Sequence, residues 1–346
     1  MTFLPVSPEA ISKGAQIIKA GGLTAFPTET VYGLGADAFN PQALAKIFEV
    51  KKRPFFDPLI IHIAALSSLE ITADLSLLNN EARKTLFLLA ENLWPGPLSI
   101  VLPKNKKIPA IASAGLSTSA IRFPDNETAQ KLITLSSGAV AAPSANPFGS
   151  LSPTKAEHVR DSLGEKIDLI IDGGPARIGL ESTVLDITEN RVKILRPGGT
   201  TKEAIESLLK IKLSSEEKSS IPDPSINIPA SPGQLKSHYA PQTPLVVLKS
   251  DEIINKKTDA EEKTALLFFD GGARDAWRAA NKIKGANVIV KTLSESGDLL
   301  QAASCFFETL HELDACNVCR IYAQLAPQTG LGEAINDRLH RASALT

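Results

Sequence analysis

The side chains best suited to chemistry are cations that follow predicted helices or strands. Lys51-Lys52-Arg53 ends a predicted helix just before Pro54, and Arg122 and Arg196 each end a predicted strand beside small or glycine-rich residues. A guanidinium group binds carboxylate or phosphate through two parallel hydrogen bonds, and an ammonium group neutralises phosphate charge. The competing interpretation is surface ion pairing, because a run of charge usually lies on a solvated face. Taken together, the cations favour an anionic substrate that carries phosphate.

A second feature is the stretch from Gly21 to Asp37, in which a short apolar run leads into a polar turn. We expect Leu23–Phe26 to form a strand that ends at Pro27, because proline has no N–H to give to a sheet. Gly33 and Gly35 are expected to let the backbone of the turn adopt positive φ or approach a ligand closely. Open α/β sheets bind ligands at such junctions of strand and turn. The polar side chains of the turn are Thr28, Glu29, Thr30 and Tyr32.

Other polar groups lie in turns or among core residues, where a structural role competes with a functional one. Ser144, Asn146 and Ser152 flank a proline-rich turn, and hydroxyl and amide groups there suit the binding of phosphate or a base. Helix capping is the alternative, and we expect Ser152 to cap the helix that contains His158. His62 alternates with apolar residues of a predicted strand, where a lone histidine is more often a satisfied core group than a ligand.

Several common catalytic and metal-binding patterns are absent from the sequence. There is no G-x-x-x-x-G-K-[ST] loop, no G-x-S-x-G elbow and no H-E-x-x-H pair. Cys316-x-x-Cys319 lacks the second pair of ligands that a zinc site needs. Cys305 and His311 are six positions apart on one predicted helix and therefore face different directions. We expect the three cysteines to be buried thiols, and no metal site made of side chains.

Composition describes an ordinary globular chain. Of 346 residues, 43% are hydrophobic and 22% are charged, which is enough for a sizeable core. The formal net charge of −1 argues against non-specific nucleic-acid binding by the chain as a whole. No run of 18 apolar residues predicts a membrane span, and the first residues do not resemble a signal peptide. Three cysteines in a chain of this length are typical of a reducing, cytoplasmic setting.

Strands and helices are predicted to alternate along both halves of the chain. From residue 245 the pattern predicts strands at 245–248, 265–269, 288–290 and 318–322 and helices at 274–283, 299–313 and 333–342. This alternation is typical of a parallel, Rossmann-like sheet.

Helix starts can also be predicted in the first half. Ser7 and Asn40, each followed by proline, are predicted caps, and a helix is expected at 80–93. We expect Asp125 to cap a helix that ends near residue 135, and Thr200 with Glu203 to form a capping box. Serine- and proline-rich residues between 211 and 243 are typical of a linker.

Seven motifs occur in an order that resembles the YrdC-type family. They are P-T-E-T-V-Y-G-L-G, K-x-R-P with P-L-I-I-H-I, A-I-R-F-P, A-P-S-A-N, E-S-T-V-L-D, R-P-G-G and, in the linker, S-P-G-Q-L-K-S-H-Y-A-P. With the second α/β unit, they make the chain similar to the two-domain L-threonylcarbamoyladenylate synthases. The resemblance implies a twisted, open mixed sheet and a smaller Rossmann-like C-terminal α/β domain. We accordingly predict a catalytic domain at 1–212, a linker at 213–243 that folds over the active site, and a C-terminal domain at 244–346.

The resemblance also implies the reaction. Family members use L-threonine, bicarbonate and ATP to make threonylcarbamoyl-AMP and pyrophosphate. Partner transferase proteins then pass the threonylcarbamoyl group to an adenosine of tRNA, so tRNA is an indirect partner. The expected mechanism relies on positioning and charge neutralisation, without a side-chain nucleophile and with Mg²⁺ carried by ATP.

Site residues carried over by motif fall into two sets. The threonine-binding set comprises Thr30, His62, Arg122, Ala142 through its backbone, and Ser182. The ATP-binding set comprises Lys51, Arg53, Asp57, Thr118, Ser144, Asn146, Ser152, Arg196 and, from the linker, Tyr239. Arg122 is the natural partner of the threonine carboxylate, and Tyr239 is expected to close over the nucleotide.

The sequence departs from the family at two places. Asp57 stands where many members carry asparagine, and a carboxylate near phosphates is unfavourable unless a cation lies between them. In the linker, Gln234, Leu235, Lys236 and Ser237 replace the family's Met, Lys, Tyr and Arg, so only Lys236 remains for a basic clamp.

Two alternative functions follow from the same residues. A concave basic face of the first domain would also suit an RNA-binding module, although the near-neutral charge argues against it. A carbamoyl transferase of the hydrogenase-maturation type would need zinc-finger cysteine clusters and a further domain, which three cysteines and this length do not allow.

Overall fold

The computed structural model describes residues 1–189, 191–213, 233, 238–258, 261–281 and 287–344. The chain divides into two compact units. The first unit comprises Met1–Phe148, Pro153–Arg177 and Glu181–Gln234, and the second comprises Gly149–Ser152, Ile178–Leu180 and Leu235–Thr346. Most of the predicted linker, including Gln234 to Ser237, lies outside the described residues, so the predicted boundaries at 212 and 243 stay a prediction.

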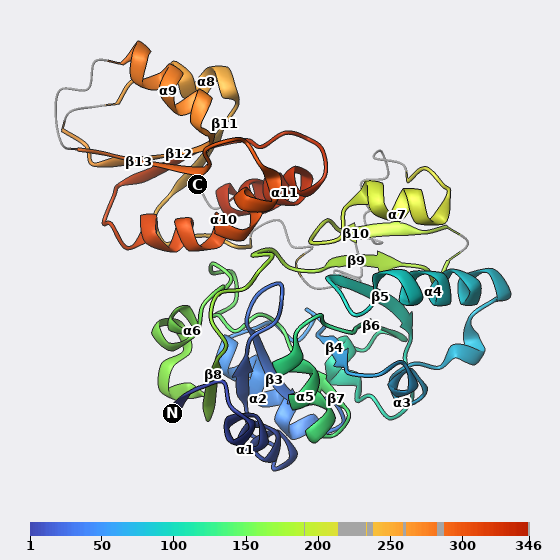
Figure 1. The fold of residues 1–346 in the computed structure, drawn as a ribbon. Coiled ribbons are helices and arrows are strands. Elements are labelled where there is room, and N and C mark those ends of the chain that lie inside the picture. Colours follow the sequence, from blue (N-terminus) through green and yellow to red (C-terminus); the bar gives the residue numbers. More distant parts are fainter. Residues whose placement is uncertain (190, 214–232, 234–237, 259–260, 282–286, 345–346) are drawn as a thin grey trace. The chain divides into compact units, whose positions relative to one another are not determined.

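The first unit is built on a ten-stranded sheet with the order β1-β8-β2-β3-β7-β4-β6-β5-β9-β10 (Figure 1). The sheet contains parallel pairs such as β4–β6 and antiparallel pairs such as β5–β6, which confirms the predicted mixed sheet. Its strands are β1 (Thr2–Pro5), β2 (Thr24–Phe26), β3 (Gly33–Asp37), β4 (Ile60–Ile63), β5 (Leu98–Pro103), β6 (Thr118–Arg122), β7 (Ala139–Ala141), β8 (Leu169–Asp172), β9 (Thr183–Asp186) and β10 (Lys193–Arg196).

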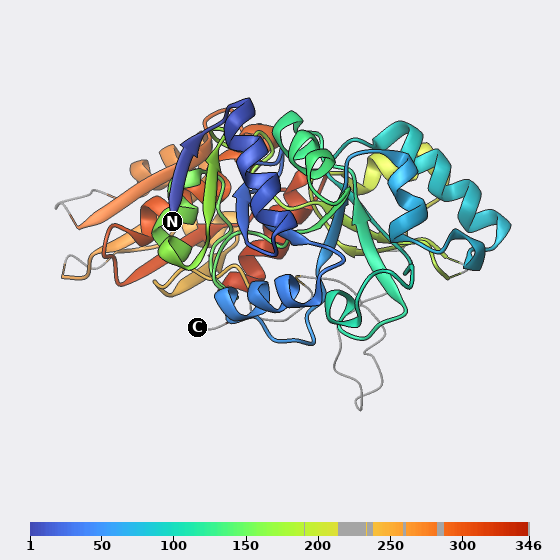
Figure 2. The same cartoon turned by 90° about the horizontal axis from the view of Figure 1, so that it is seen from below.

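Helices of the first unit pack their apolar faces against this sheet in two separate cores. Residues of α1 and α5 share one core with Phe26 and Val140 of the sheet, and the two helices run side by side in Figure 2. The larger core receives α2, α4 and α6. The helices are α1 (Pro8–Lys19), α2 (Pro41–Lys51), α3 (Leu69–Thr72), α4 (Asn80–Leu93), α5 (Glu127–Leu135), α6 (Ala156–Leu163) and α7 (Lys202–Leu209).

The glycines of the opening stretch lie in a strand, which corrects their predicted place on a turn. Gly33 and Gly35 belong to β3, which pairs antiparallel with β2. A Cβ atom on Gly35 would lie 2.8 Å from Phe26 Cε1 and 3.0 Å from Val140 Cγ1, closer than carbon atoms can approach. These glycines therefore leave room for core side chains, and the polar turn is confined to the residues between β2 and β3.

Helix caps were predicted correctly in two cases and one residue off in two others. The Ser7 and Asn40 side chains accept hydrogen bonds from the first turns of α1 and α2. Asn126 rather than Asp125 caps α5, and Thr201 rather than Thr200 caps α7. In each case two adjacent residues are both of a type favoured at the N-cap, so the sequence alone does not distinguish them.

The predicted cap at Ser152 is wrong. Helix α6 begins at Ala156, and its N-cap residue Lys155 makes no capping hydrogen bond through its side chain. Pro153 lies too early to occupy the first helical position of α6. Ser152 instead belongs to the second unit.

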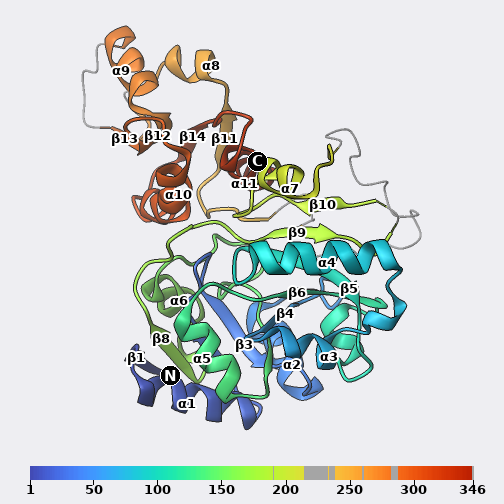
Figure 3. The ribbon, with the colours of Figure 1, turned by 45° about the vertical axis from the view of Figure 1, so that its right-hand side comes forward.

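The second unit contains a parallel sheet, as predicted, and its four strands have the order β11-β14-β12-β13. Figure 3 shows α8 and α9 on one side of this sheet and α10 and α11 on the other. The short helix α8 was not predicted. The elements are β11 (Leu245–Leu248), α8 (Ser250–Ile254), β12 (Thr264–Asp270), α9 (Gly271–Ala280), β13 (Val288–Ser294), α10 (Leu299–Asp314), β14 (Arg320–Gln324) and α11 (Leu331–Ser343).

Two short segments that precede residue 181, Gly149–Ser152 and Ile178–Leu180, complete the second unit. The Ala240 N–H donates to Gly149 O at 2.8 Å, and Ser150 and Ala240 form a parallel bridge. Gly179 lies so close to α10 that a Cβ atom there would be 2.4 Å from Ala303 O. Among the described residues of the whole chain, no helix is both long and apolar enough to cross a membrane.

Candidate active site in the first unit

One row of residues crosses the middle of the first sheet on a single face. His62 of β4 lies opposite Arg122 of β6, and Arg122 lies opposite Ser99 of β5. Residues directly opposite on neighbouring strands share a face. Thr118 lies on the same face because it is two steps of two from Arg122 along β6. The row is flanked by a small apolar cluster of Ile60, Val101, Ala120 and Val184, separate from the main core.

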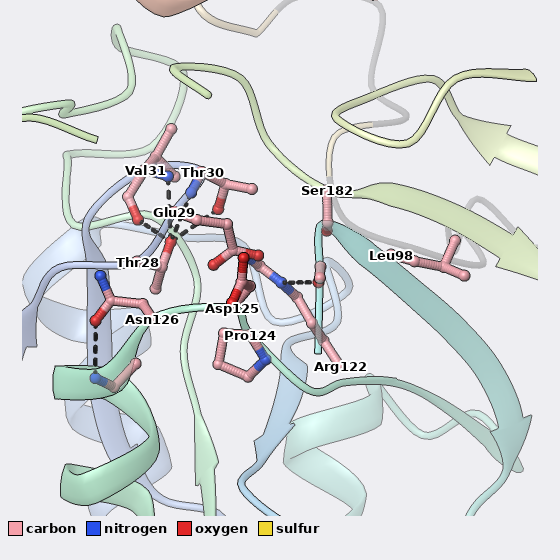
Figure 4. Close-up of polar contacts among 12 residues, drawn as sticks. Thr28, Glu29, Thr30, Val31, Leu98, Arg122, Pro124, Asp125, Asn126 and Ser182 are labelled. Carbon is pink, nitrogen blue, oxygen red and sulfur yellow. Dashed lines mark hydrogen bonds and ion pairs between the residues drawn. The ribbon is translucent and has the colours of Figure 1, made fainter. Parts of the chain in front are cut away.

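A buried ion pair connects this row to the polar turn after β2. Arg122 Nη2 lies 2.6 Å from Glu29 Oε1, and the two side chains are only 5% and 1% exposed. Arg122 Nε also donates to Gly96 O at 3.4 Å. Figure 4 shows the Glu29 carboxylate facing the Arg122 guanidinium. Arg122 is therefore buried and oriented toward the turn, as a receptor for a carboxylate requires.

The polar turn is held in shape by the Thr28 hydroxyl. Thr28 Oγ1 donates to Val31 O at 2.6 Å and accepts from the N–H groups of Thr30 and Val31. Its single proton is thus used, so the Thr30 hydroxyl donates across the 2.8 Å that separates the two Oγ1 atoms. The lone pairs of the Thr30 hydroxyl are left to accept hydrogen bonds. This network, drawn in Figure 4, also sets the position of Glu29 between the two threonines.

Ser182 joins the row to Arg196. The Ser182 and Ser99 Oγ atoms lie 2.8 Å apart, and Arg196 Nη2 donates to Ser182 O at 2.8 Å and to its Oγ at 3.2 Å. The R-P-G-G motif permits this contact, because a Cβ atom on Gly198 would lie 2.3 Å from Glu181 O. Both side chains are buried.

Lys51 is buried at the end of α2 and is 1% exposed. Its Nζ donates to the carbonyl oxygens of Ser144, at 2.6 Å, and of Asn146. Burial, reinforced by the nearby charge of Arg53, holds the pKa of the Lys51 ammonium well below its usual value. Such a cation gains from the arrival of a phosphate, which would restore the stability of its charged form.

Arg53 and Asp57 form a second buried ion pair, with Nη2 and Oδ2 2.8 Å apart. Arg53 also donates to the carbonyl oxygens of Asp57 and Pro58. Burial raises the pKa of the Asp57 carboxyl, although Arg53, Lys51 and Arg196 all act to lower it. The three cations therefore surround one carboxylate, which answers how the family's asparagine position tolerates an aspartate here. Asp57 Oδ1 has no hydrogen-bond partner.

His62 stays neutral at physiological pH. Burial, helped by the charge of Arg122, lowers the pKa of its imidazole to about 3. Its Nδ1 lies 3.2 Å from Ile60 O, and hydrogen bonds with the backbone of Ile60 and Val140 act to raise the pKa without offsetting burial. His62 thus contributes a neutral, fixed ring beside Arg122.

The structure brings most of the predicted site residues together. Contacts run from Thr30 and Glu29 through Arg122, Ser99 and Ser182 to Arg196, and electrostatic interactions continue to Asp57, Arg53 and Lys51. Ala142 lies at the end of β7 and donates its N–H to Ile60 O at 3.0 Å. Ser144 and Asn146 supply the carbonyls that bind Lys51. The roles of these residues toward ligands stay predictions.

Ser152 and Tyr239 are not in the first unit. Both belong to the second unit, where Ser152 O lies 3.1 Å from His311 Nε2. Tyr239 is buried with a φ of 63° and has Phe307 and the guanidinium of Arg338 beside its ring. Their membership of the ATP set stays a prediction. Lys236, the residue left for a basic clamp in the linker, lies outside the described residues.

Sequence reasoning missed two residues of this arrangement. Glu29 was placed on the turn without a role, and the signal that could have found it was a carboxylate between two threonines in a motif of the family. Ser99 gave a weaker signal, as one polar residue among the apolar residues of its strand. Both matter because of what they contact across the sheet.

The cysteines differ from their predicted burial. Cys319 is exposed, and Cys305 and Cys316 are half-buried free thiols. Among the residues that the structure describes, no group of three His, Cys, Asp or Glu side chains is placed to hold a metal ion.

Comparison with known proteins shows the family of the chain. Residues 16–198 match the Sua5/YciO/YrdC family model, described as "Telomere recombination", and residues 200–344 match the model of the threonylcarbamoyl-AMP synthase C-terminal domain. The threonylcarbamoyl-AMP synthase of Pyrococcus abyssi is 39% identical over 340 residues, which are 95% of this chain and 92% of the relative. That of Bacillus subtilis is 39% identical over 349 residues, covering 98% of this chain and 94% of the relative.

A solved structure extends the likeness to three dimensions. The crystal structure of P. abyssi Sua5 complexed with L-threonine matches with a TM-score of 0.83 and 37% identity, covering 99% of this chain and 97% of that one. Because both halves match their family models and full-length relatives align almost end to end, the chain belongs to the two-domain threonylcarbamoyl-AMP synthase family.

Proposed function

We propose that the chain synthesises L-threonylcarbamoyl-AMP from L-threonine, bicarbonate and ATP and releases pyrophosphate. The relatives named threonylcarbamoyl-AMP synthase, alike over nearly their whole length, support this activity. The threonine bound to P. abyssi Sua5 supports the amino-acid substrate. The product would serve the first step of threonylcarbamoyladenosine formation in tRNA.

The observation that carries the proposal is the connection of an amino-acid receptor to a cation cluster through Ser182 and Arg196. Arg122 offers a buried guanidinium to the threonine carboxylate, with Thr30, His62, Ser182 and the backbone of Ala142 around it. Ser182 contacts Arg196, whose charge belongs to the cluster around Asp57. A threonine on Arg122 would therefore lie next to groups that suit ATP phosphates.

The chemistry follows from this adjacency. The threonine amine captures bicarbonate carbon as a carbamate, and a carbamate oxygen then attacks the α-phosphorus of ATP in line while pyrophosphate leaves. Lys51, Arg53 and Arg196 neutralise phosphate charge that grows in the transition state, together with Thr118, Ser144 and Asn146. We assign no side chain as nucleophile, because fixed geometry and charge supply the catalysis.

Mg²⁺ is proposed to enter with ATP. It prefers oxygen ligands and keeps several waters, so phosphate oxygens suit it better than a protein cage. The one carboxylate in the cation cluster, Asp57, is engaged by Arg53. We therefore expect Mg²⁺ bound to the polyphosphate to neutralise the leaving pyrophosphate.

The remaining partners are part of the same proposal. Downstream tRNA threonylcarbamoyl transferase proteins would consume the product, with tRNA as the final acceptor, in the cytoplasm where ATP and tRNA are available. Residues 213–243 are proposed to fold over the site and to bring Tyr239 to the nucleotide, with Ser152 in the ATP set. Truncation after Lys210 tests this linker role, and full activity without the linker would contradict it.

No second function is favoured. An RNA-binding face requires exposed cations that reach a phosphate backbone. Lys51, Arg53 and Arg196 are instead buried. Such cations suit a small, enclosed anion better than a polymer.

The test is threonine-dependent release of pyrophosphate from ATP in the presence of bicarbonate. We expect turnover to need all three substrates and to fall strongly when serine replaces threonine. Equal rates with serine would remove the threonine assignment. No pyrophosphate release with threonine, together with tight and salt-sensitive RNA binding, would instead favour the RNA-binding alternative.

A further inference from the structure

The Glu29 carboxylate has one oxygen whose role the proposed reaction leaves open. Oε1 pairs with Arg122 at 2.6 Å, whereas Oε2 is buried and has no hydrogen-bond partner. Buried polar atoms are almost always partnered, because an unpaired one loses the hydrogen bonds that water would supply. An unpaired carboxylate oxygen beside a substrate-binding arginine is therefore a candidate for contact with the substrate itself.

The charges of the Arg122–Glu29 pair are complementary to those of an amino acid. Threonine carries a carboxylate and an ammonium on the same carbon, and the pair presents a cation and an anion whose paired atoms, Arg122 Nη2 and Glu29 Oε1, lie 2.6 Å apart. A carboxylate bound to Arg122 brings its own ammonium within reach of the neighbouring carboxylate. The turn is rigid enough to aim Glu29, because the Thr28 hydroxyl makes hydrogen bonds with Val31 and Thr30.

We infer that Glu29 receives the threonine amino group and removes its first proton, which makes Glu29 the general base for carbamate formation. This inference rests on the proposed function. An ammonium has no lone pair and cannot attack carbon, so a proton must leave before the N–C bond forms. A buried carboxylate that touches the ammonium is well placed to take it.

The step balances in atoms and charge. One N–H bond of the threonine ammonium breaks, and its proton forms an O–H bond with Glu29 Oε2. Bicarbonate separates into CO₂ and hydroxide, and the amine lone pair forms the N–C bond while a C–O π pair moves onto oxygen. The hydroxide takes the second amine proton as water. The products are the carbamate, water and protonated Glu29, which returns its proton to solvent before the next turnover.

The competing view is that Glu29 only orients Arg122. The two roles differ in their dependence on pH. A positioning residue changes binding of threonine without changing which protonation state of the amine reacts. With a base, the rate near neutral pH does not depend on the small fraction of threonine that carries a free amine. Without the base, only that fraction reacts, and the rate becomes proportional to it.

The experiment compares wild type with Glu29→Gln by following pyrophosphate release from pH 6.5 to 9.5 at saturating ATP and bicarbonate. Glutamine keeps an oxygen that accepts from Arg122 but cannot take a proton. We expect kcat at pH 7 to fall by about 10² to 10⁴-fold. The variant's kcat should also rise about tenfold for each pH unit, as the free amine of threonine does, while the wild-type rate stays nearly level.

Glu127→Gln is the matched control, because Glu127 pairs with Lys131 on the surface of α5 and is 80% exposed. Its kcat and pH profile should match those of wild type. Glu29→Asp serves if Glu29→Gln does not fold, and it should keep the wild-type shape of the profile at a lower rate.

Two results would overturn the inference. One is a Glu29→Gln enzyme with the wild-type kcat and profile, and the other is a change confined to the KM for threonine. A Glu29→Asp enzyme whose rate rises with pH as the free amine does would have the same meaning. If the wild-type enzyme released no pyrophosphate with threonine, the proposed function would fail as well. Failure of the proposed function is thus distinguished from failure of the Glu29 inference alone.

Discussion

The two units of the chain differ in how deeply their charged side chains are buried. In the first unit several ionisable side chains are buried, among them Glu29, Lys51, Asp57, His62 and Arg122. In the second unit, ion pairs such as Lys291–Glu312 are 43% and 48% exposed. Arg338 is the second unit's fully buried cation among the described residues, and it lies 2.8 Å from Asp337.

This difference indicates where chemistry is expected. Removing a charge from water costs several kcal/mol, and a partner returns only part of that. In the first unit several charged side chains are buried at this cost, and Glu29 and Asp57 have carboxylate oxygens without a hydrogen-bond partner. The second unit instead fills its parallel sheet with aromatic and aliphatic residues such as Phe268 and Trp277. Buried charges with unpartnered carboxylate oxygens thus distinguish the first unit, where ligand binding is proposed.

The largest effect on stability and threonine binding is expected from Arg122→Ala in the first unit. This change leaves the Glu29 carboxylate buried without its cation, so we expect the free energy of unfolding to fall by about 3–5 kcal/mol. Threonine affinity should fall several-fold or more, because its carboxylate loses its receptor. Denaturant unfolding and calorimetric titration with threonine measure the two effects. Threonine binding at wild-type affinity would contradict the role of Arg122.

The pH dependence of stability gives the next largest effect. The folded pKa of His62 is about 3, below its ordinary value of 6.5, so below pH 6.5 the unfolded state takes up a proton that the folded state does not. Stability is therefore lost as pH falls from 6.5 toward 3, by up to about 1.4 kcal/mol for each pH unit. We expect His62→Gln to flatten the dependence of unfolding free energy on pH.

The control for this measurement is His340→Gln, which changes an exposed histidine of α11. Its pH dependence should follow that of wild type. A wild-type slope retained in His62→Gln would mean that other groups cause the acid lability.

Asp57→Asn tests how a buried carboxylate affects phosphate binding by the cation cluster. Asp57 competes with phosphate for Arg53, Lys51 and Arg196, so removing its charge should tighten ATP binding by roughly 1 kcal/mol, about fivefold. Burial raises the pKa of Asp57, so wild-type affinity should approach that of the variant as pH falls and Asp57 becomes protonated.

ATP titrations at several pH values measure the effect of Asp57→Asn. Asp125→Asn is the control, because it removes a carboxylate from an exposed pair with Arg177. Weaker ATP binding by Asp57→Asn would show that the carboxylate supports the cations more than it competes with phosphate.

The smallest effect is expected in the second unit. Lys291→Ala removes an exposed ion pair with Glu312, and such pairs contribute about 0–1 kcal/mol. Urea unfolding should therefore show a change of less than about 1 kcal/mol. A loss as large as that of Arg122→Ala would erase the distinction between the two units.

Local elements followed from the sequence where periodicity and stop signals agreed. The predicted helix at 80–93 coincides with α4, because apolar residues recur at helical spacing and Trp94-Pro95 ends them. The strand β11 was also predicted to the residue. In contrast, the sequence predicts a turn where β3 forms, because its glycines carry no hydrophobic pattern and their role depends on the Phe26 ring of another strand.

The order of motifs and the local patterns determined the family resemblance, the mixed and parallel sheets and the residue types of the candidate site, because these depend on residues near one another in the chain. Only the tertiary structure decided the pairings that give the site its properties. Arg122 meets Glu29 across 93 residues and Ser99 meets Ser182 across 83. Those contacts exist because the strand order sets β4, β6, β5 and β9 side by side, and burial among them then removes the water that would otherwise solvate each charge.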